Sequence, residues 1–364
     1  MINGQTRSPE GAQRIPGFSP DMPLPGIRCA PSGLRTAVYT CVAALTLCAA
    51  FAGATHAQVP STSSGQAFPT RPIRIVAPYV PGGGVDFVAR TIAAKLTEVI
   101  GQQIVVENRP GGGTNIGSEA VVRAAPDGYT VLLGGVPNTA NMTLFKKPPY
   151  DVVKDFAPVV QTTIAPNILA VHPSVPVRSV KDLIALAKNR RGELTFASAG
   201  IGSSNHLSGE MFRIMAAVDI IHVPYKGGGA AVTDLLAGQV SMYFGTTPST
   251  IPFVRTGRLR ALAVTGAQRS RAAPDIPTMS ETALPGFEQS AWHGILAPAG
   301  TPPAVVNKLN ADIVRVLRMP DTIERMAAQG VDVIGNTPAA IAAFNRQDVV
   351  KYEKLVKSAG IKIE

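Results

Sequence analysis

Short apolar runs alternate with helical patterns after residue 70, and this alternation constrains the fold more than any other feature of the sequence. Three brief runs predict buried strands: residues 72–78, 103–108 and 129–135. Between the first two, apolar side chains recur at the spacing of one helical face: Val88, Ile92, Leu96 and Val99. Strand–helix–strand order implies a parallel sheet, so we expect an α/β fold.

The same alternation begins again near residue 180. Ser179 and Asp182 have the spacing of a capping box, which predicts the start of a helix. The segments that follow alternate in type: a strand at 194–198, a helix through Leu207 and Met211, a strand at 219–224, a helix through Leu235 and a strand at 239–244. We therefore expect a second α/β unit.

Two further strands connect the units. We expect the strand at residues 168–173 to lead the chain out of the first unit, and the strand at residues 259–266 to lead it back. Residues 291–364 then supply another strand and three helices, one beginning at Thr337-Pro338. A chain that leaves one lobe, builds a second and returns makes two crossings, which form a hinge. The expected lobes are residues 69–170 with 266–364 for lobe 1, and 171–265 for lobe 2.

The first 57 residues have a different character. Arg28 and Arg35 flank the start of an uncharged apolar run that ends in small residues. This is the pattern of a secretory signal peptide with an N-terminal extension, and we expect cleavage after Ala57, with residues 58–68 as a linker. The exported protein would be periplasmic, and Met22 is an alternative start.

Two other interpretations of this leader stay open. Residues 36–54 are almost long enough to span a bilayer as a retained anchor. Cys48 could belong to a lipoprotein signal, although Leu47 stands where a small residue is expected. The threonines in the apolar run and the small residue Ala57 at its end favour a cleaved signal peptide over a retained anchor.

Cysteine usage and charge exclude several classes of function. All three cysteines lie in the leader, so the exported protein would have no disulfide, thiolate nucleophile or cysteine metal site. The net charge is +10, of which four Arg and two acidic residues of the leader contribute +2 and leave +8. Because the Lys and Arg are scattered singly, we expect no nucleic-acid partner and a weak long-range attraction for small anions.

Two predicted strand-to-helix junctions share one design. Residues 77–90 (APYVPGGGVDFVAR) and 198–207 (SAGIGSSNHL) are rich in small residues. Ligands of parallel α/β sheets bind outside the carboxyl ends of the strands. Glycine lets backbone N–H groups approach a ligand, and a helix begins with unpaired N–H donors and a partial positive charge. We therefore predict an anion held by main-chain amides and Ser hydroxyls, without Arg or Lys.

The strength of hydrogen bonds requires both junctions. Each bond to a charged group contributes about 1.5–3 kcal/mol, and micromolar affinity corresponds to about 8 kcal/mol. One loop with two or three donors is marginal, whereas two loops closing on a ligand suffice. A plain tight turn is the alternative for either loop, and it is favoured for a third glycine-rich turn at 108–117.

Other chemistries have weaker signals. The glycine spacing only approximates a dinucleotide fingerprint, so we expect no cofactor. The histidines of the exported part are dispersed, which makes a metal site improbable. A hydrolase or isomerase using Ser203 or His206 is the alternative to a binding protein, although no nucleophile-elbow motif is present. Asp86 begins a helix, where a carboxylate caps it, and could also receive a ligand ammonium or hydroxyl.

These segments together resemble the Bug family, the extracytoplasmic solute receptors of tripartite tricarboxylate transporters. The resemblance extends over residues 69–364 and is carried by many motifs in one order, which include PYVPGGGVDFVAR, ENRPGGGTNIGSEAV, SAGIGSSNHLSGEMF, HVPYKGGGAAVTDLLAGQV and APAGTPPAVVNKLN. It implies a two-lobed, type II "Venus flytrap" periplasmic binding protein. It also implies a small carboxylated ligand such as a dicarboxylate, an acidic amino acid or an aromatic acid.

The resemblance also implies site residues. The lobe-1 side would be lined by Tyr79, Gly83, Gly84 and Asp86. The lobe-2 side would be lined by Ser198, Gly202, Ser203, Ser204 and Asn205, with Thr246 as a further lining residue. Val80 replaces a commoner proline, and the segment 240–247 lacks the acidic residue that the family more often shows there. The second departure leaves the distal contacts of the ligand open.

The function implied is capture of an organic carboxylate by lobe closure. A monomeric receptor would then deliver the acid to tripartite permease subunits or to a sensor kinase.

Overall fold

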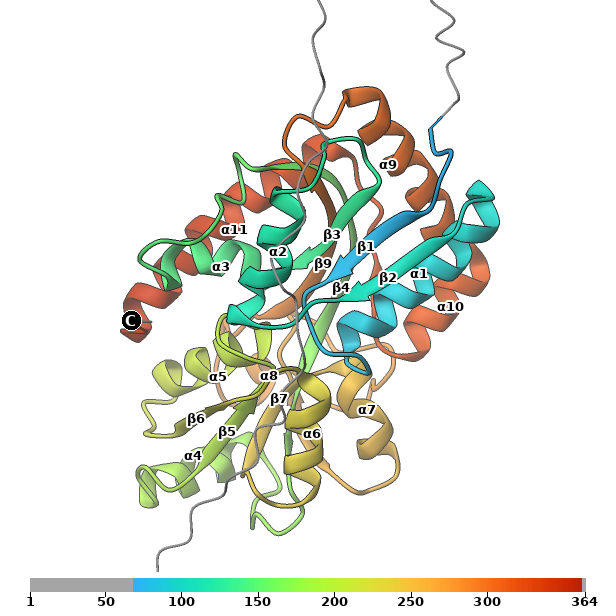
Figure 1. Ribbon diagram of the computed structural model, residues 1–364. Helices are drawn as coiled ribbons and strands as arrows, with labels where there is room; N and C mark the ends of the chain where they lie inside the picture. Colours follow the sequence, from blue (N-terminus) through green and yellow to red (C-terminus); the bar gives the residue numbers. More distant parts are fainter. Residues whose placement is uncertain (1–67, 362–364) are drawn as a thin grey trace, which may run out of the picture. The chain divides into compact units, whose positions relative to one another are not determined.

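The computed structural model describes residues 68–361, so the predicted leader and residues 58–67 of the predicted linker lie outside the described residues. Figure 1 shows two groups of elements joined by strand β4. Lobe 1 begins with these elements: β1 (Ile73–Ala77), α1 (Gly84–Ile100), β2 (Ile104–Asn108), the 3₁₀ turn η1 (Gly112–Thr114), α2 (Asn115–Val122), β3 (Thr130–Gly135) and α3 (Val136–Leu144). The three predicted strands are confirmed to within one residue.

Lobe 2 follows the predicted alternation. Its elements are α4 (Val180–Asn189), β5 (Thr195–Ser198), α5 (Ser204–Met215), β6 (Ile221–Pro224), α6 (Gly228–Leu236), β7 (Met242–Thr246), α7 (Thr247–Arg255), β8 (Arg260–Val264) and α8 (Met279–Thr282). Helix α4 begins where Ser179 Oγ accepts a hydrogen bond from the Asp182 amide at 3.1 Å. Helix α7 follows β7 directly and was not predicted.

The remaining elements complete lobe 1 and cross between the lobes. They are β4 (Phe156–Val171), β9 (Ser290–Pro298), α9 (Pro303–Leu317), α10 (Pro320–Ala328), β10 (Asp332–Val333) and α11 (Pro338–Ala359). Strand β4 has 16 residues and is far longer than the crossing predicted at 168–173. Its first part pairs with β9, and from Asn167 onward it pairs with β7 and β8.

The strand order is the same in both lobes. Lobe 1 has the order β2-β1-β3-β9-β4, and lobe 2 has the order β6-β5-β7-β4-β8. In each lobe the first three strands are parallel, and the strand that enters from the other lobe pairs antiparallel with the third. This repeated order defines the α/β, type II two-lobed fold that the sequence predicts.

Apolar cores cover both faces of the inner part of each sheet, whereas the edge strands β2 and β6 are partly exposed. The inner strands β1 and β3 are accordingly nearly continuous apolar runs. In β1, Ile75 packs toward α1 and α9, whereas Val76 packs in the cluster that includes Ile341 of α11. A separate cluster joins α3, the start of α5 and α11 across the lobes: Val136, Ala140, Leu144, Leu207, Tyr352 and Val356. The two lobes are therefore in contact.

The return crossing lies later than the sequence suggests. Met279, Leu284 and Phe287 are buried in the core of lobe 2, and Ala273 belongs to its second core cluster. The segment 266–289, which the sequence places in lobe 1, therefore packs with lobe 2. Its apolar side chains complete faces of the lobe-2 sheet, and the chain returns only at β9.

Candidate functional site

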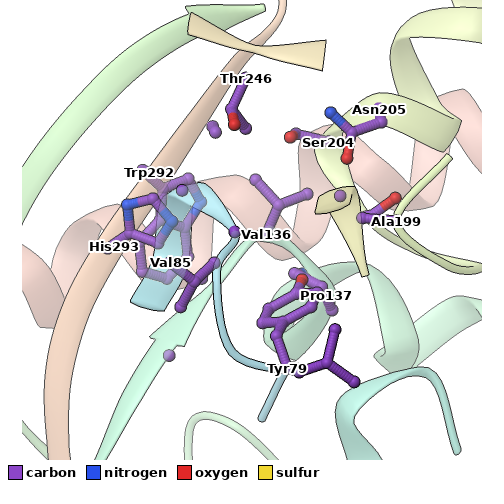
Figure 2. A pocket seen from close by; sticks show the side chains of 18 of the residues that line it. Tyr79, Val85, Val136, Pro137, Ala199, Ser204, Asn205, Thr246, Trp292 and His293 are labelled. Atoms are coloured by element: carbon purple, nitrogen blue, oxygen red, sulfur yellow. The ribbon is translucent and has the colours of Figure 1, made fainter. Parts of the chain in front are cut away.

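A pocket, called the inner pocket here, lies where several strand-to-helix junctions of the two lobes meet (Figure 2). Its lining comes from the β1–α1 junction (79, 80 and 83–85), the β3–α3 junction (134–137), the β5–α5 junction (199 and 203–205), Gly228, Tyr243, Thr246 and residues 291–293 of β9. Figure 2 shows Val85, Trp292 and His293 on one side, facing Ala199, Ser204 and Asn205. Both lobes therefore contribute opposite walls.

Five helices begin at this pocket. Their N-caps are Gly83 for α1, Gly135 for α3, Ser203 for α5, Gly227 for α6 and Thr246 for α7. Helices α1, α6 and α7 have no side-chain cap among the described residues, which leaves first-turn N–H groups available. None of the described residues that line the pocket is Asp, Glu, Lys or Arg. The electrostatic character of the pocket thus comes from helix N-termini, which favour an anion.

The structure brings seven of the ten predicted site residues to the inner pocket. They are Tyr79, Gly83, Gly84, Ser203, Ser204, Asn205 and Thr246. Several of their polar atoms already have partners that orient them. Ser203 Oγ donates to Gly200 O at 2.6 Å, and the Asn205 amide donates to the backbone oxygen of Phe244. The backbone N–H groups at the helix starts are thus supported by a fixed loop.

Ser198, Gly202 and Asp86 are not among the residues that line this pocket. Ser198 is fully buried, and its hydroxyl lies 2.7 Å from His222 Nε2 behind the β5–α5 loop. Gly202 has φ +78° and packs against α3, where a Cβ would lie 2.7 Å from Asn141 Oδ1. Both residues shape the loop from outside the pocket.

Asp86 braces the other loop. Its Oδ2 accepts hydrogen bonds from the Gly82 amide at 3.1 Å and from Arg90 Nε at 2.9 Å, and its Oδ1 accepts from Asn108 Nδ2 at 3.1 Å. Although burial opposes ionisation, the hydrogen bonds from Arg90, Gly82 and Asn108 hold the pKa of Asp86 below its usual value. The carboxylate therefore holds the β1–α1 loop. It lies in the first turn of α1, where its charge suits the helix dipole, but it accepts from Gly82 and does not cap a first-turn N–H group.

Sequence reasoning missed the β3–α3 junction and the β9 wall. A signal for the first was present, because Gly134-Gly135 ends a predicted strand and Pro137 suits a helix start. A Cβ on Gly135 would lie 2.7 Å from Trp292 O, so glycine lets α3 begin close to β9. No local pattern predicts the β9 wall, because its place between β3 and β4 depends on the whole topology.

Tyr243 of β7 supplies an unused polar group. Its side chain is fully buried and lines the inner pocket. The hydroxyl forms no hydrogen bond of normal length with a described residue, although the Ser249 hydroxyl, which donates to Thr246 O, lies near it. Burial raises the pKa of Tyr243, so the phenol keeps its proton at neutral pH. An unpaired buried hydroxyl is costly, and a bound acceptor at this place would satisfy it.

His293 is a neutral part of the wall. Its Nδ1 lies 3.1 Å from Thr163 Oγ1, and its ring is largely buried. Burial lowers the pKa of His293 to about 4. The imidazole therefore carries no formal charge at neutral pH, which leaves the inner pocket without a cationic side chain.

A second pocket, called the outer pocket here, shares Tyr79, Ala199 and Ser203 with the inner one. Residues 111–114 contribute its lobe-1 side, and Tyr225 and Lys226 contribute to its lobe-2 side. Among the described residues that line it, Lys226 is the one with a formal charge. The third glycine-rich turn, interpreted from sequence as a plain turn, thus borders a pocket.

Glycines mediate close contacts between the lobes. A Cβ at Gly84 of α1 would lie 2.7 Å from Thr246 Oγ1 at the start of α7. A Cβ at Gly227 would lie 2.4 Å from Val80 Cγ2. Atoms this close need a neighbour to move, so the absence of side chains lets the lobes approach at the pocket.

Across residues 68–361, no group of three or more His, Cys, Asp or Glu residues could hold a metal ion. Within the same range, no helix combines the length and the apolar character needed to cross a membrane.

A two-lobed fold with a pocket between its lobes, lined by helix N-termini, defines a solute-binding protein of the periplasmic type. Comparison with known proteins gives the family. Residues 88–361 match the model of the tripartite tricarboxylate transporter family receptor, TctC. The chain belongs to this family of periplasmic substrate-binding receptors, which includes the Bug proteins.

Similar proteins match most of this chain over nearly their whole length. The UPF0065 protein in the tcbD-tcbE intergenic region of Pseudomonas sp. (strain P51) is 39% identical over 84% of this chain and 92% of that protein. Protein BugT of Bordetella pertussis is 36% identical over 85% of this chain and 95% of its own length.

Two similar solved structures contain carboxylates. R. palustris Rpa4515 with adipate is 36% identical and superposes with a TM-score of 0.80, covering 82% of this chain and 100% of the other. MatC (Rpa3494) from Rhodopseudomonas palustris with bound malate is 33% identical with a TM-score of 0.76, covering 79% of this chain and 100% of the other.

Proposed function

We propose that this receptor captures a small organic carboxylate in the inner pocket and delivers it to the membrane subunits of a tripartite transporter or to a sensor kinase. One observation carries the proposal: five helix N-termini meet at a pocket, and none of the described residues that line it has a formally charged side chain. Such a pocket can neutralise an anion through fixed N–H dipoles. The carboxylates bound to two similar proteins support the same ligand class.

We propose that the carboxylate contacts backbone N–H groups and hydroxyls of both lobes. The contact residues would be Tyr79, Gly83, Gly84, Ser203, Ser204, Asn205 and Thr246, with Tyr243 in addition. The apolar part of the ligand would pack against Val85, Val136 and Trp292 of the same pocket. A ligand too long for the inner pocket would extend into the outer one, toward Lys226.

The cellular setting follows from the family of periplasmic receptors. We propose that the leader directs export, that cleavage follows Ala57, and that the mature receptor is a monomer. N-terminal sequencing of protein recovered from a periplasmic fraction checks the cleavage site. A mature chain beginning at another residue would contradict it.

An enzymatic role has less support from the geometry. Ser203 Oγ donates to Gly200 O, and His206 Nδ1 accepts from the Gly202 amide at 3.2 Å, so neither side chain activates the other. Two Ser–His side-chain pairs occur among the described residues, Ser198 with His222 and Ser174 with His172. Both pairs lie outside the two pockets that the binding proposal uses. Saturable binding without conversion of the acid would support the receptor role.

A thermal-unfolding panel tests the proposal on the mature chain. A ligand that binds only the native state stabilises it, by about 2.7 kcal/mol at 100 times its Kd. We expect one or more of adipate, malate, glutamate and benzoate to raise the Tm saturably. Adipamide serves as the matched uncharged control for adipate. The proposal fails if no acid raises the Tm, or if the amide stabilises as strongly as the acid.

A further inference from the structure

Helix α11, at the C-terminus, lies behind the inner pocket and contacts both lobes. Its inward face packs against α3 and β4 of lobe 1, and Tyr352 and Val356 share an apolar cluster with Leu207 of α5. Two residues one turn apart on this face, Phe344 and Asp348, contact the pocket-lining Trp292. The helix therefore sets the position of a pocket wall without entering the pocket.

Asp348 is a buried carboxyl group with two donors from pocket elements. Its Oδ2 accepts a hydrogen bond from Trp292 Nε1 at 2.9 Å and lies 2.6 Å from Thr139 Oγ1. The residue is 5% exposed and forms no ion pair among the described residues. Burial raises the pKa of Asp348. A carboxyl group without a cationic partner is expensive to bury, so its place here calls for a specific role.

Both donors come from elements that line the inner pocket. Trp292 itself lines the pocket from β9. Thr139 does not line it, but lies in the first turn of α3, whose residues Val136 and Pro137 do. The indole is also held edge-on by Phe344, with ring centroids 5.2 Å apart and planes at 87°. A buried indole N–H normally requires an acceptor, and Asp348 provides it.

We propose that Asp348 is a positioning residue of the carboxylate site, which fixes the Trp292 indole and the first turn of α3 as one rigid wall. The inference rests on the proposed function and deepens it, because this wall faces the β5–α5 loop that would hold the carboxylate. Without the acceptor, the indole can rotate into the space that the ligand needs. The N–H donors at the start of α3 are then no longer held at a fixed distance and orientation from the N–H donors at the start of α5.

The first arm of the experiment needs no ligand. Trp292 is the single tryptophan of the chain, so its emission spectrum and its near-ultraviolet circular dichroism band report this wall alone. In Asp348→Ala, we expect a shifted emission maximum, a weakened dichroism band and stronger acrylamide quenching. Asp348→Asn keeps an amide oxygen as acceptor and should retain the wild-type spectra. Glu353→Ala, on the same helix and paired with Lys357, is the matched control.

The second arm measures affinity for adipate, malate, glutamate and benzoate by calorimetry. For each acid that binds the wild type, Asp348→Ala should weaken binding about tenfold. This is the change in affinity that the loss of roughly one hydrogen bond to the ligand would cause. Asp348→Asn and Glu353→Ala should stay close to wild type. Thr139→Val, which removes one donor, should weaken binding about threefold. This variant decides the question if Asp348→Ala does not fold.

The outcomes separate the two proposals. Wild-type spectra in Asp348→Ala overturn the positioning role, as does a lost dichroism band with unchanged affinity. Loss of affinity in Asp348→Asn equal to that in Asp348→Ala also overturns it. If no acid binds the wild type, the proposed function fails, and the ligand-free spectra still decide whether Asp348 holds Trp292.

Discussion

At the scale of single residues, the site is built from groups with no formal charge, and Tyr243 is the clearest case. Its hydroxyl is buried at the pocket without a hydrogen bond of normal length to a described residue, which costs stability in the ligand-free protein. The same group becomes a donor once an acceptor arrives. The Tyr243 hydroxyl therefore lowers the stability of the ligand-free receptor and raises its affinity for the carboxylate.

Tyr243→Phe tests both effects. We expect affinity for a bound carboxylate to fall about tenfold or more, because a hydrogen bond to a charged group contributes about 1.5–3 kcal/mol. The free energy of unfolding without ligand should stay the same or rise, because the unpaired hydroxyl is removed. Calorimetry and urea unfolding measure the two quantities. Tyr129→Phe, whose hydroxyl contacts Thr70 far from the pocket, is the control. Weakened stability with unchanged affinity would contradict the role.

The residues of the site were predictable where local pattern decides their place. Gly83, Ser203 and their neighbours follow strands and begin helices, so topology brings them to one edge of a sheet. Trp292 and Tyr243 were out of reach, because their positions depend on long-range pairing with no local sequence pattern. Asp86 and Gly202 lie at the right loops, but the direction of a side chain within a loop depends on contacts made after folding.

At the scale of elements, glycine at the helix starts sets how closely the lobes approach. Helices α1 and α7 come from different lobes, and their first turns meet at Gly84 and Thr246. A methyl group at Gly84 would lie 2.7 Å from Thr246 Oγ1, closer than such atoms tolerate. Closure of the lobes therefore depends on the absence of a side chain at this position.

Gly84→Ala should hold the lobes apart. We expect weaker carboxylate binding and a larger radius of gyration in solution with saturating acid, measured by small-angle X-ray scattering. Gly229→Ala is a matched control, because a Cβ at this helical glycine would meet no atom within 4 Å. Adding Thr246→Ala to Gly84→Ala removes the clashing hydroxyl and should restore compaction. Compaction by Gly84→Ala alone to the wild-type value would refute this account.

The elements themselves were predicted unevenly, for a physical reason. Strands β1 and β3 are largely buried on both faces, so their apolar runs are visible in the sequence. The edge strand β2 was visible from its β-branched run 104–106, although Val105 is exposed. Strand β4 contains Pro158, Pro166 and the polar residues 161–163, and it was missed over most of its length. It is a strand because it pairs with different partners in the two lobes, which no local propensity encodes.

At the scale of the whole molecule, the buried His206 and His293 and the partly buried His222 make stability depend on pH. Burial lowers the pKa of His206 to about 3, with nearby His222 and Arg213 adding to the shift, and burial lowers the pKa of His222 and His293 to about 4. The rings of His206 and His222 are stacked 4.2 Å apart behind the β5–α5 loop. Unfolding exposes all three to water, where histidine has a pKa near 6.5.

The sign of the effect follows from these shifts. Between about pH 6.5 and 4 the unfolded chain binds protons that the native protein does not, so stability is complete above pH 6.5 and falls with acidification. Each histidine can contribute a slope of about 1.4 kcal/mol per pH unit. Urea unfolding at pH 7, 5.5 and 4.5 should show the loss, and His222→Gln should reduce its slope. His172→Gln is the control, and equal slopes in wild type and His222→Gln would refute the assignment.

Strand β9 has a consequence for how the protein is made. It occupies the middle of the lobe-1 sheet, between β3 and β4, yet it is formed by residues that come after the whole of lobe 2. A nascent chain synthesised only as far as residue 289 therefore lacks the strand that pairs with both β3 and β4 in the lobe-1 sheet. Native pairing of the lobe-1 sheet therefore cannot be completed until about the last fifth of the polypeptide is available, so this sheet stays unfinished through most of synthesis.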